Sequence, residues 1–273
     1  MGAPAAGDAR RAAAGDARSL VPAVSRAAAI LDELAGGEGG ALGPSELARR
    51  LSLPKSSVVN ICNALVDAGL ARRRDGGFVL GGKLAELGAA YLSAFDLVRE
   101  FHEACAAADP PVEETLQLAV LGDGLDVIYL ARRDGSHRVR LASDVGRRLP
   151  ATCTATGKAL LASLPPGEAA ARLPQDGGLA TLTPNSIARV KALLEELERV
   201  RALGFAVDRE ETLEGVTCVG AAVPAVTPDG DRAAVSCTLL TPRAGDDRIV
   251  LLAQRVQALA GELADRVGTA RQS

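Results

Sequence analysis

The sequence predicts an α+β protein with two domains, a small helical domain that ends in a β-hairpin and a larger domain built on an antiparallel sheet. The chain has 273 residues, of which 48% are hydrophobic, and this length usually forms two domains. Apart from that hairpin, apolar residues recur with helical spacing as far as about residue 108, whereas strand patterns prevail from Thr115 onward. Helices around an antiparallel sheet are typical of the α+β class.

Composition and charge narrow the class of protein. No apolar run approaches the roughly 18 residues of a membrane span, and charged residues interrupt the alanines of residues 1–20, so no signal peptide is expected. We expect a cytoplasmic protein with no membrane partner, in which residues 1–20 form a disordered tail. The net charge is −3, yet residues 44–74 hold six basic and two acidic side chains, which suggests a local contact with a polyanion.

The cysteines and histidines do not form a recognisable metal site. The five cysteines contain no C-x-x-C pair, and the two histidines give no standard zinc spacing. His102 and Cys105 could share a helix face, but two ligands do not close a site. We therefore expect reduced thiols, no metal and no cofactor.

The first domain, predicted over residues 21–83, begins with three short helices. An amphipathic run over residues 24–35 ends at Gly36, and a second helix starts at Pro44. Pro54, whose fixed φ suits a first helical turn, starts a third helix after a tight turn. Three helices with a tight connection between the second and third match a helix-turn-helix.

The third helix carries small polar side chains on a face of their own. In LPKSSVVNICNALVDAGL the predicted core face is formed by Val58, Ile61 and Leu65. A separate face is formed by Ser56, Asn60, Asn63 and Asp67. A solvated helix would favour Glu, Lys and Arg there, whereas hydroxyl and amide groups can reach phosphates and base edges in a major groove. A plain surface helix with weak helix formers remains the alternative.

A basic hairpin follows the third helix. The Asp75-Gly76 dipeptide between apolar runs is a strong hairpin signal, and three arginines, residues 72–74, lie on its first arm. A helix-turn-helix followed at once by such a hairpin is a winged helix, whose wing can lie against phosphates; the arginines could instead protect a sheet edge from aggregation. The residues predicted to contact DNA are Ser45, Arg49, Lys55, Ser56, Ser57, Asn60, Asn63, Arg72, Arg73 and Arg74.

A linker helix is predicted over residues 84–108, where apolar residues return to helical spacing. Four of the six aromatic side chains of the chain lie within residues 78–101. Aromatic residues on a helix that joins domains suggest packing between domains or subunits, and two-fold DNA sites require a dimer.

The remaining residues, 109–273, are predicted to form a sheet with helices around it. Strands are expected in a hairpin over residues 115–133, at residues 138–144, and on either side of Pro228-Asp229-Gly230. Helices are expected in the stretch ATCTATGKALLASL, over residues 187–203, and over residues 249–267.

Four blocks of sequence resemble the IclR family of bacterial transcriptional regulators, in the family's order and spacing: LPKSSVVNICNALVDAGL, LPATCTATGKALLA, GFAVDREETLEGVTCVGAAV and AAVSCTLLTP. The resemblance covers about residues 21–267. It implies an N-terminal winged helix, a linker helix, a GAF-like effector-binding domain, and homodimers or homotetramers that bind double-stranded operator DNA. It also implies a small-molecule effector, often an organic or aromatic acid, that changes DNA affinity; most members repress.

The resemblance implies six effector-binding positions. Backbone N–H groups would come from Ala155 and Thr156, and side chains from Asp208, Cys218, Ser236 and Thr238. Chain geometry agrees with this set. Cys218, Ser236 and Thr238 all have even numbers, so one face of a paired sheet could present all three side chains. A helix that starts near Ala155 would direct its free N–H groups at an anion. Each residue could also belong to the core. We expect no aromatic residue in the pocket close to these motifs, which argues against large aromatic effectors.

Other functions fit the sequence less well. A nucleophilic Cys218 would need a base, yet both histidines lie 81 or more positions earlier. The stretch CTATGKA lacks the first glycine of a phosphate-binding loop and has Ala159 where Ser or Thr must hold magnesium. We therefore expect no enzyme. The alternative function is a cysteine-based redox-sensing DNA-binding regulator, since Cys218 and Cys237 could be neighbours on adjacent strands.

Overall fold

The computed structural model describes residues 21–36, 40–93, 96–108, 111–122, 124–136, 144–175, 178–224 and 232–270. The chain divides into two compact units, Met1–Ala94 and Phe95–Ser273, and each is described by itself. The tail predicted over residues 1–20 and nearly all of the strand predicted at 138–144 lie outside the described residues. No helix among the described ranges is long and apolar enough to cross a membrane.

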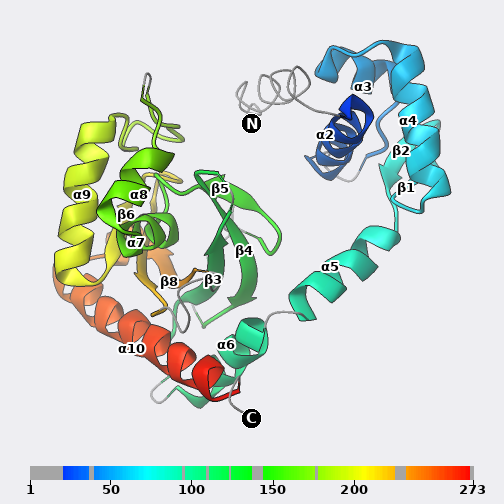
Figure 1. Ribbon diagram of the computed structural model, residues 1–273. Helices are drawn as coiled ribbons and strands as arrows, with labels where there is room; N and C mark the ends of the chain where they lie inside the picture. The colour runs from blue at the N-terminus through cyan, green and yellow to red at the C-terminus, as the bar shows by residue number, and fades with distance from the viewer. Residues whose placement is uncertain are drawn as a thin grey trace. The chain divides into compact units, whose positions relative to one another are not determined.

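The N-terminal unit is the predicted winged helix-turn-helix (Figure 1). Its elements are α2 (Pro22–Gly36), α3 (Pro44–Leu51), α4 (Lys55–Asp67), β1 (Ala71–Arg74), β2 (Gly77–Leu80) and α5 (Lys83–Ser93). The two strands pair antiparallel, and Leu42, before α3, forms a further antiparallel bridge with Phe78 of β2. The three predicted helices and the hairpin after them are confirmed.

One apolar core holds this unit together. Ile30, Val58 and Phe78, from α2, α4 and β2, are at most 2% exposed. The predicted core face of α4 needs one correction, because Cys62 is fully buried whereas Ile61 is only partly buried at the margin of the core. Helical spacing does not separate these two neighbours, since the apolar stripe of a core-facing helix is broad enough to include both.

Two tight turns set the geometry of the unit. Ser52, directly after α3, has a φ of 54°, a left-handed conformation that is unfavourable for L side chains. The Leu53 N–H donates to the Ala48 carbonyl at 3.0 Å and closes this turn. In the hairpin, Asp75 and Gly76 both have positive φ, 47° and 77°, as the type I′ turn of a two-residue loop requires.

Replacing Ser52 with glycine should stabilise the helix-turn-helix. Glycine adopts the left-handed region without a Cβ clash, so Ser52→Gly should raise the free energy of unfolding by about 1 kcal/mol. The matched change Ala64→Gly, at an exposed position inside α4, should lower it by about 1 kcal/mol. Hydrogen exchange of the α3 and α4 amides measures both effects. Equal destabilisation by the two changes would contradict the left-handed turn.

The segment predicted as a linker helix contains two described helices, one in each unit. The first is α5, and the second is α6 (Asp96–Ala107), which packs on α10 (Asp246–Ala270) in the C-terminal unit. Phe101 and Ala104 of α6 are fully buried, whereas Leu87 and Tyr91 of α5 are 51% and 48% exposed. The segment is helical as predicted, but its second half belongs to the core of the larger unit.

The C-terminal unit is built on one six-stranded antiparallel sheet. Its strands are β3 (Thr115–Leu121), β4 (Asp126–Arg133), β5 (Arg148–Pro150), β6 (Ala206–Arg209), β7 (Val216–Ala222) and β8 (Ala233–Leu240), in the order β5-β4-β3-β8-β7-β6. The α+β class and the four central strands are confirmed. Sequence patterns do not predict the edge strands β5 and β6, because three and four residues are too few to show an alternation.

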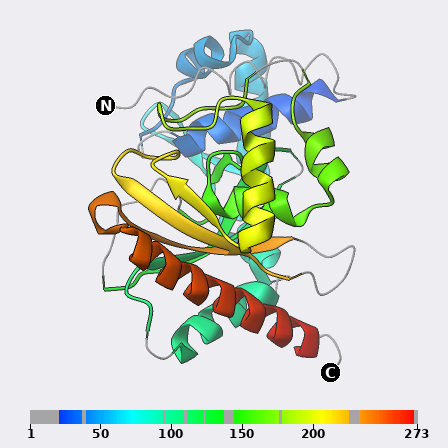
Figure 2. The same cartoon turned by 90° about the vertical axis from the view of Figure 1, so that its left-hand side faces the viewer.

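Helices cover both faces of this sheet (Figure 2). On one face α10 and α6 pack, and on the other face α7 (Ala155–Ser163) packs against β6, β7 and β8, with α9 (Val190–Leu203) against α7. Residues 155–162 of α7 are all buried between the sheet and α9. The unpredicted α8 (Pro166–Arg172) and a short 3-10 helix, Thr241–Arg243, complete the unit.

Candidate functional site

The polar row predicted on α4 lies on the surface of the N-terminal unit. Lys55, Ser56 and Asn60 are exposed, and Ser57 and Asn63 are partly buried. The opposite side of the helix packs into the core, so these groups are available to a partner. No side-chain cap occupies the N-terminal end of α4, and its first N–H groups can therefore also receive a phosphate.

The three arginines of the wing are held in different ways. Arg73 Nη2 donates to Asn63 Oδ1 at 2.6 Å, and its guanidinium carbon lies 5.1 Å from the centre of the Phe78 ring, a cation–π geometry. All three arginines are exposed, and Arg74 Nε lies 3.3 Å from Asp75 Oδ2. Arg73 thus fixes the wing against α4, a contact that the sequence pattern does not reveal.

On α3, Glu46 organises two arginines. Arg49 Nη2 and Arg50 Nε donate to Glu46 Oε1 at 2.7 and 2.8 Å. These hydrogen bonds lower the pKa of Glu46 to about 2, so its carboxylate is ionised at neutral pH. Arg49 and the nearby Ser45 are exposed, and both predicted contacts on α3 therefore lie at the surface.

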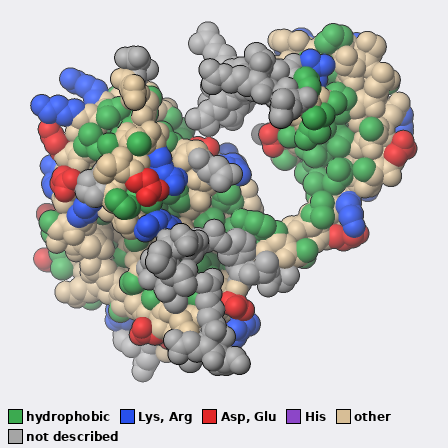
Figure 3. Space-filling view, viewed as in Figure 1, with side chains coloured by type: hydrophobic (Ala, Val, Ile, Leu, Met, Phe, Trp, Pro, Cys, Tyr) green, Lys and Arg blue, Asp and Glu red, His purple; other side chains and the backbone are tan. Residues whose placement is uncertain are grey.

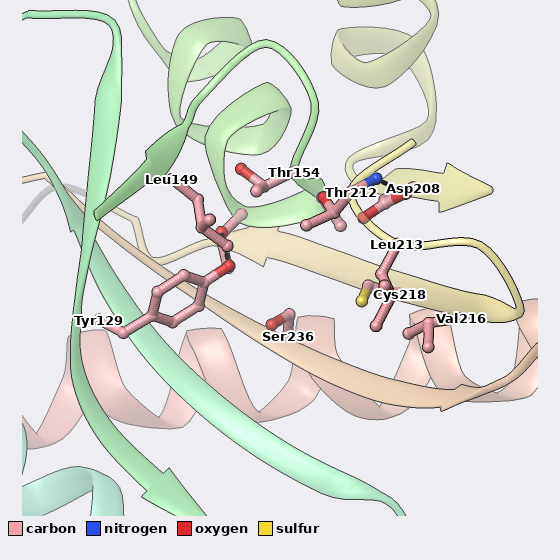
Figure 4. Close-up of a pocket in the computed structure, with 11 residues that line it drawn as sticks. Tyr129, Leu149, Thr154, Asp208, Thr212, Leu213, Val216, Cys218 and Ser236 are labelled. Carbon is pink, nitrogen blue, oxygen red and sulfur yellow. Dashed lines mark hydrogen bonds between the residues drawn. The ribbon is translucent and has the colours of Figure 1, made fainter. Parts of the chain in front are cut away.

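The C-terminal unit contains a pocket between the first turn of α7, the sheet and the segment after β6 (Figure 4). The unoccupied space within it is about 360 Å³, a figure that includes open solvent, so the enclosed part is smaller. Its lining residues are Tyr129, Leu149, Thr154, Ala155, Thr156, Asp208, Thr212, Leu213, Val216, Cys218 and Ser236. Five of the six predicted effector positions lie around this pocket, and Thr238 is the exception.

The first turn of α7 presents backbone N–H groups to the pocket. Thr154 caps the helix by accepting a hydrogen bond from the Gly157 N–H at 3.1 Å, which leaves the N–H groups of Ala155 and Thr156 without an intrahelical partner. A Cβ at Gly220 of β7 would lie 3.0 Å from Thr156 N, so glycine permits this close approach. N–H groups at a helix N-terminus favour an anion.

Asp208 on β6 is the acidic group that lines the pocket. It is 1% exposed, and its Oδ1 accepts hydrogen bonds from the backbone N–H groups of Glu211 at 2.6 Å and Thr212 at 3.3 Å. Burial raises the pKa of Asp208 above its ordinary value, although these bonds and the charge of Lys158 act in the opposite direction. A buried carboxyl with a raised pKa in a pocket is typical of a functional group.

Cys218 and Ser236 form the floor of the pocket from neighbouring strands. Ser236 is 2% exposed and lies beneath the pocket in Figure 4. Thr238 is fully buried, with its hydroxyl 3.2 Å from Cys218 Sγ and 3.4 Å from Gln117 Oε1. The structure therefore places Thr238 beside the floor rather than on the surface of the pocket.

The sequence does not point to Tyr129 of β4 as a lining residue. Its phenol oxygen lies 3.4 Å from Thr156 Oγ1, and burial raises its pKa, so the phenol stays protonated at neutral pH. With Leu149 it forms a wall across the pocket from Asp208 (Figure 4). The inference that the pocket lacks an aromatic residue is therefore wrong, because only the fold brings β4 next to α7.

Cys218 and Cys237 lie on adjacent strands but on opposite faces of the sheet. Cys237 pairs with Val219 in the strand register, and successive side chains of a strand point to opposite faces. Burial raises the pKa of both thiols, to about 12 for Cys237, which keeps them protonated and unreactive. All five cysteines are free, and nothing in this geometry supports the redox alternative.

These features define a DNA-binding protein of the winged helix-turn-helix class whose second unit contains a small pocket. The family model of the IclR helix-turn-helix domain matches residues 23–75, and that of the C-terminal domain of bacterial transcriptional regulator IclR matches residues 89–265. The chain belongs to the IclR family of bacterial transcriptional regulators.

Known proteins are similar to this chain in sequence or in fold. HTH-type transcriptional regulator Rv1719 of Mycobacterium tuberculosis (strain ATCC 25618 / H37Rv) is 38% identical over 210 residues, which cover 76% of this chain and 78% of that protein. The structure of the Agobacterium tumefaciens repressor BlcR is 33% identical, with a TM-score of 0.58 and coverage of 91% and 98%. An IclR homologue of Microbacterium hydrocarbonoxydans, complexed with 4-hydroxybenzoate, has the same fold at 23% identity, a TM-score of 0.68 and coverage of 88% and 98%.

The buried Asp208 carboxyl should lower the stability of the protein at neutral pH. Because burial raises its pKa in the folded state, its stabilising contribution is present at low pH and is lost as the pH rises through that raised pKa. Asp208→Asn should therefore raise the melting temperature at about pH 7.5, by a difference that shrinks as the pH falls.

Asp246→Asn is the matched control, because the side chain of Asp246 on α10 is 93% exposed. This change should leave the pH dependence of the melting temperature as it is in the wild type. Calorimetric melting of the two variants across the pH range separates the effects. A lower melting temperature for Asp208→Asn at about pH 7.5 would mean that the carboxylate stabilises the fold instead.

Proposed function

We propose that the protein is a cytoplasmic repressor that acts by binding rather than catalysis: its winged helix binds double-stranded operator DNA, and a small carboxylic acid in the C-terminal pocket changes that affinity. Family membership supports transcription regulation and DNA binding, and the similarity to the repressor BlcR supports repression rather than activation. The proposal of an effector rests on one observation: the N–H groups of a helix, the Ser236 hydroxyl and the Asp208 carboxyl all lie around the same pocket.

The DNA-binding proposal rests on α4 and the wing. Ser56 and Asn60 are exposed along α4, where they can reach phosphates and base edges. Arg72 and Arg74 are exposed on the wing and suit phosphates, whereas Arg73 holds the wing against α4. Sequence readout is therefore assigned to α4 and sequence-independent affinity to the wing.

The salt dependence of binding separates these roles. DNA is selected from a random pool with the wild-type protein, and affinity is measured by fluorescence anisotropy at several salt concentrations. Arg72→Ala and Arg74→Ala should each weaken binding to all sequences and reduce the salt slope by about 0.9. Asn60→Ala should instead remove about 1–3 kcal/mol of discrimination at one base pair of the selected site.

Lys191→Ala is the control, because this lysine is exposed on α9 in the C-terminal unit. It should change neither the salt slope nor the base preference. An unchanged slope in both arginine variants would remove the wing from the interface, and an unchanged base preference in Asn60→Ala would remove α4 from sequence readout.

The effector proposal rests on complementarity between the pocket and a small acid. The first N–H groups of α7 and the Ser236 hydroxyl can donate to a carboxylate, while Asp208 can accept from a hydroxyl group of the same ligand. Tyr129 supplies an aromatic wall for the carbon skeleton. 4-Hydroxybenzoate, which the Microbacterium hydrocarbonoxydans homologue holds, has all three features and is a suitable first probe.

Thermal shifts test the pocket directly. 4-Hydroxybenzoate, lactate and glycolate are compared with their neutral amides, because a ligand that binds only the folded state raises the melting temperature by mass action. The acids should give a shift and the amides should not. Ser236→Ala should weaken acid binding about tenfold, the loss of one charge-assisted hydrogen bond.

Two glycine variants sharpen this test. Gly220→Ala places a Cβ 3.0 Å from Thr156 N and should abolish acid binding, whereas Gly245→Ala has no atom within 4 Å of its Cβ and should bind normally. Equal shifts with acids and amides would contradict an anion site. Undiminished binding by Gly220→Ala would place that site away from the start of α7.

We also propose assembly into a homodimer or homotetramer. Large apolar side chains are exposed on the N-terminal unit, namely Val21 and Val24 at the start of α2 and Leu87 and Tyr91 on α5. Figure 3 shows hydrophobic side chains gathered over α2. Association of two copies would remove this surface from water and supply the symmetry that a two-fold operator requires.

A further inference from the structure

A buried ammonium group lies behind the pocket. Lys158, on the first turns of α7, is 1% exposed, although lysine is almost never buried unless it is paired. Its Nζ donates to the Val207 carbonyl at 2.6 Å, forms an ion pair with Glu211, and lies 3.6 Å from Glu196 Oε1 on α9. One side chain therefore joins α7, β6, the segment after β6, and α9.

The segment that Lys158 contacts after β6 forms one wall of the pocket. Residues 208–213 contribute Asp208, Thr212 and Leu213 to the lining. The Glu211 N–H donates to Asp208 Oδ1 at 2.6 Å, and Thr212 Oγ1 donates to the Cys153 carbonyl at 3.1 Å. The Glu211 side chain pairs with Lys158, and neither residue lines the pocket, so the ion pair supports this wall from outside the pocket.

Three carboxyl groups lie near Lys158, those of Asp208, Glu211 and Glu196. Glu196 also pairs with Arg199 at 2.8 Å, whereas the Oε2 atom of Glu211 is buried with no hydrogen bond in the described part of the chain. Burial raises the pKa of Asp208 and of Glu211, and the positive charge of Lys158 lowers both. Loss of this ammonium would leave two buried carboxyls without the cation that opposes their burial.

We propose that Lys158 is a positioning residue of the effector pocket: it fixes the wall of residues 208–213 against the first turn of α7, so that Asp208 and the helix N–H groups face the same ligand. Lys158 is not itself among the lining residues, so it acts on the ligand only through that wall. The inference rests on the proposed effector pocket, but its central measurement requires no ligand.

Hydrogen exchange of the full-length protein tests this role. Lys158→Met keeps most of the apolar stem of the side chain and removes the ammonium group with its charge. After correction for intrinsic rates, amides of residues 208–213 should exchange at least about tenfold faster in this variant, whereas those of residues 250–263 in α10 should be unchanged. This loss of protection should shrink as the pH falls, because both carboxyls, whose pKa rises without Lys158, become protonated and no longer need a cation beside them.

Two further variants keep the result interpretable. Glu211→Gln retains the shape of the side chain and should loosen the same segment, and its effect should not add to that of Lys158→Met in the double variant, since both remove one interaction. Lys191→Met, at the exposed lysine of α9, is the matched control and should leave the segment protected.

The proposal would be overturned by unchanged exchange of residues 208–213 or by additive effects in the double variant. Equal acceleration of exchange in α10 would also overturn it, because Lys158 would then stabilise the whole unit rather than one wall. The acid thermal shifts are read separately. If no acid binds the wild type while residues 208–213 respond as expected, the proposed effector function fails and the positioning of this segment by Lys158 stands.

Discussion

The C-terminal unit depends on how closely the first turn of α7 approaches the sheet and the strand before it. Cβ atoms at Gly157 and Gly220 would lie 2.2 Å from the Ala151 carbonyl oxygen and 3.0 Å from Thr156 N, so neither position has room for a side chain. This approach brings the N–H groups of α7 next to β7, and it buries residues 155–162 between the sheet and α9. The shape of the pocket and the burial of Lys158 both follow from it.

The same packing explains how an ionisable cluster persists in the interior. Buried charges are tolerated when they are paired, and removal of one partner is more damaging than replacement of the whole pair by apolar groups. Because Lys158 extends from α7 toward the end of β6, its ammonium group meets Glu211 directly and opposes the rise in the pKa of Asp208. An apolar contact could pack as well, so the charged arrangement is better explained by the proposed ligand site than by stability.

Local signals predict the N-terminal unit better than the pocket. Pro54 and the Asp75-Gly76 turn constrain neighbouring backbone angles, so a few residues are enough to place a helix start and a hairpin. In the pocket, the family resemblance identifies Asp208 but neither Tyr129 nor Lys158, whose side-chain partners lie 27 and 53 residues away in the chain. Those contacts are created by the order of strands in the sheet, which no local pattern of residues contains.

Coupling between the pocket and the winged helix is tested most directly by a reciprocal titration of the full-length protein. DNA affinity is measured by fluorescence anisotropy with and without saturating 4-hydroxybenzoate, and the affinity for 4-hydroxybenzoate is measured by calorimetry with and without the selected DNA. Thermodynamic linkage requires both affinities to change by the same factor, which is typically about 5–150-fold for allosteric proteins. We expect a mutual weakening within that range. An acid that occupies the pocket while both affinities stay constant would contradict control of DNA binding by this site.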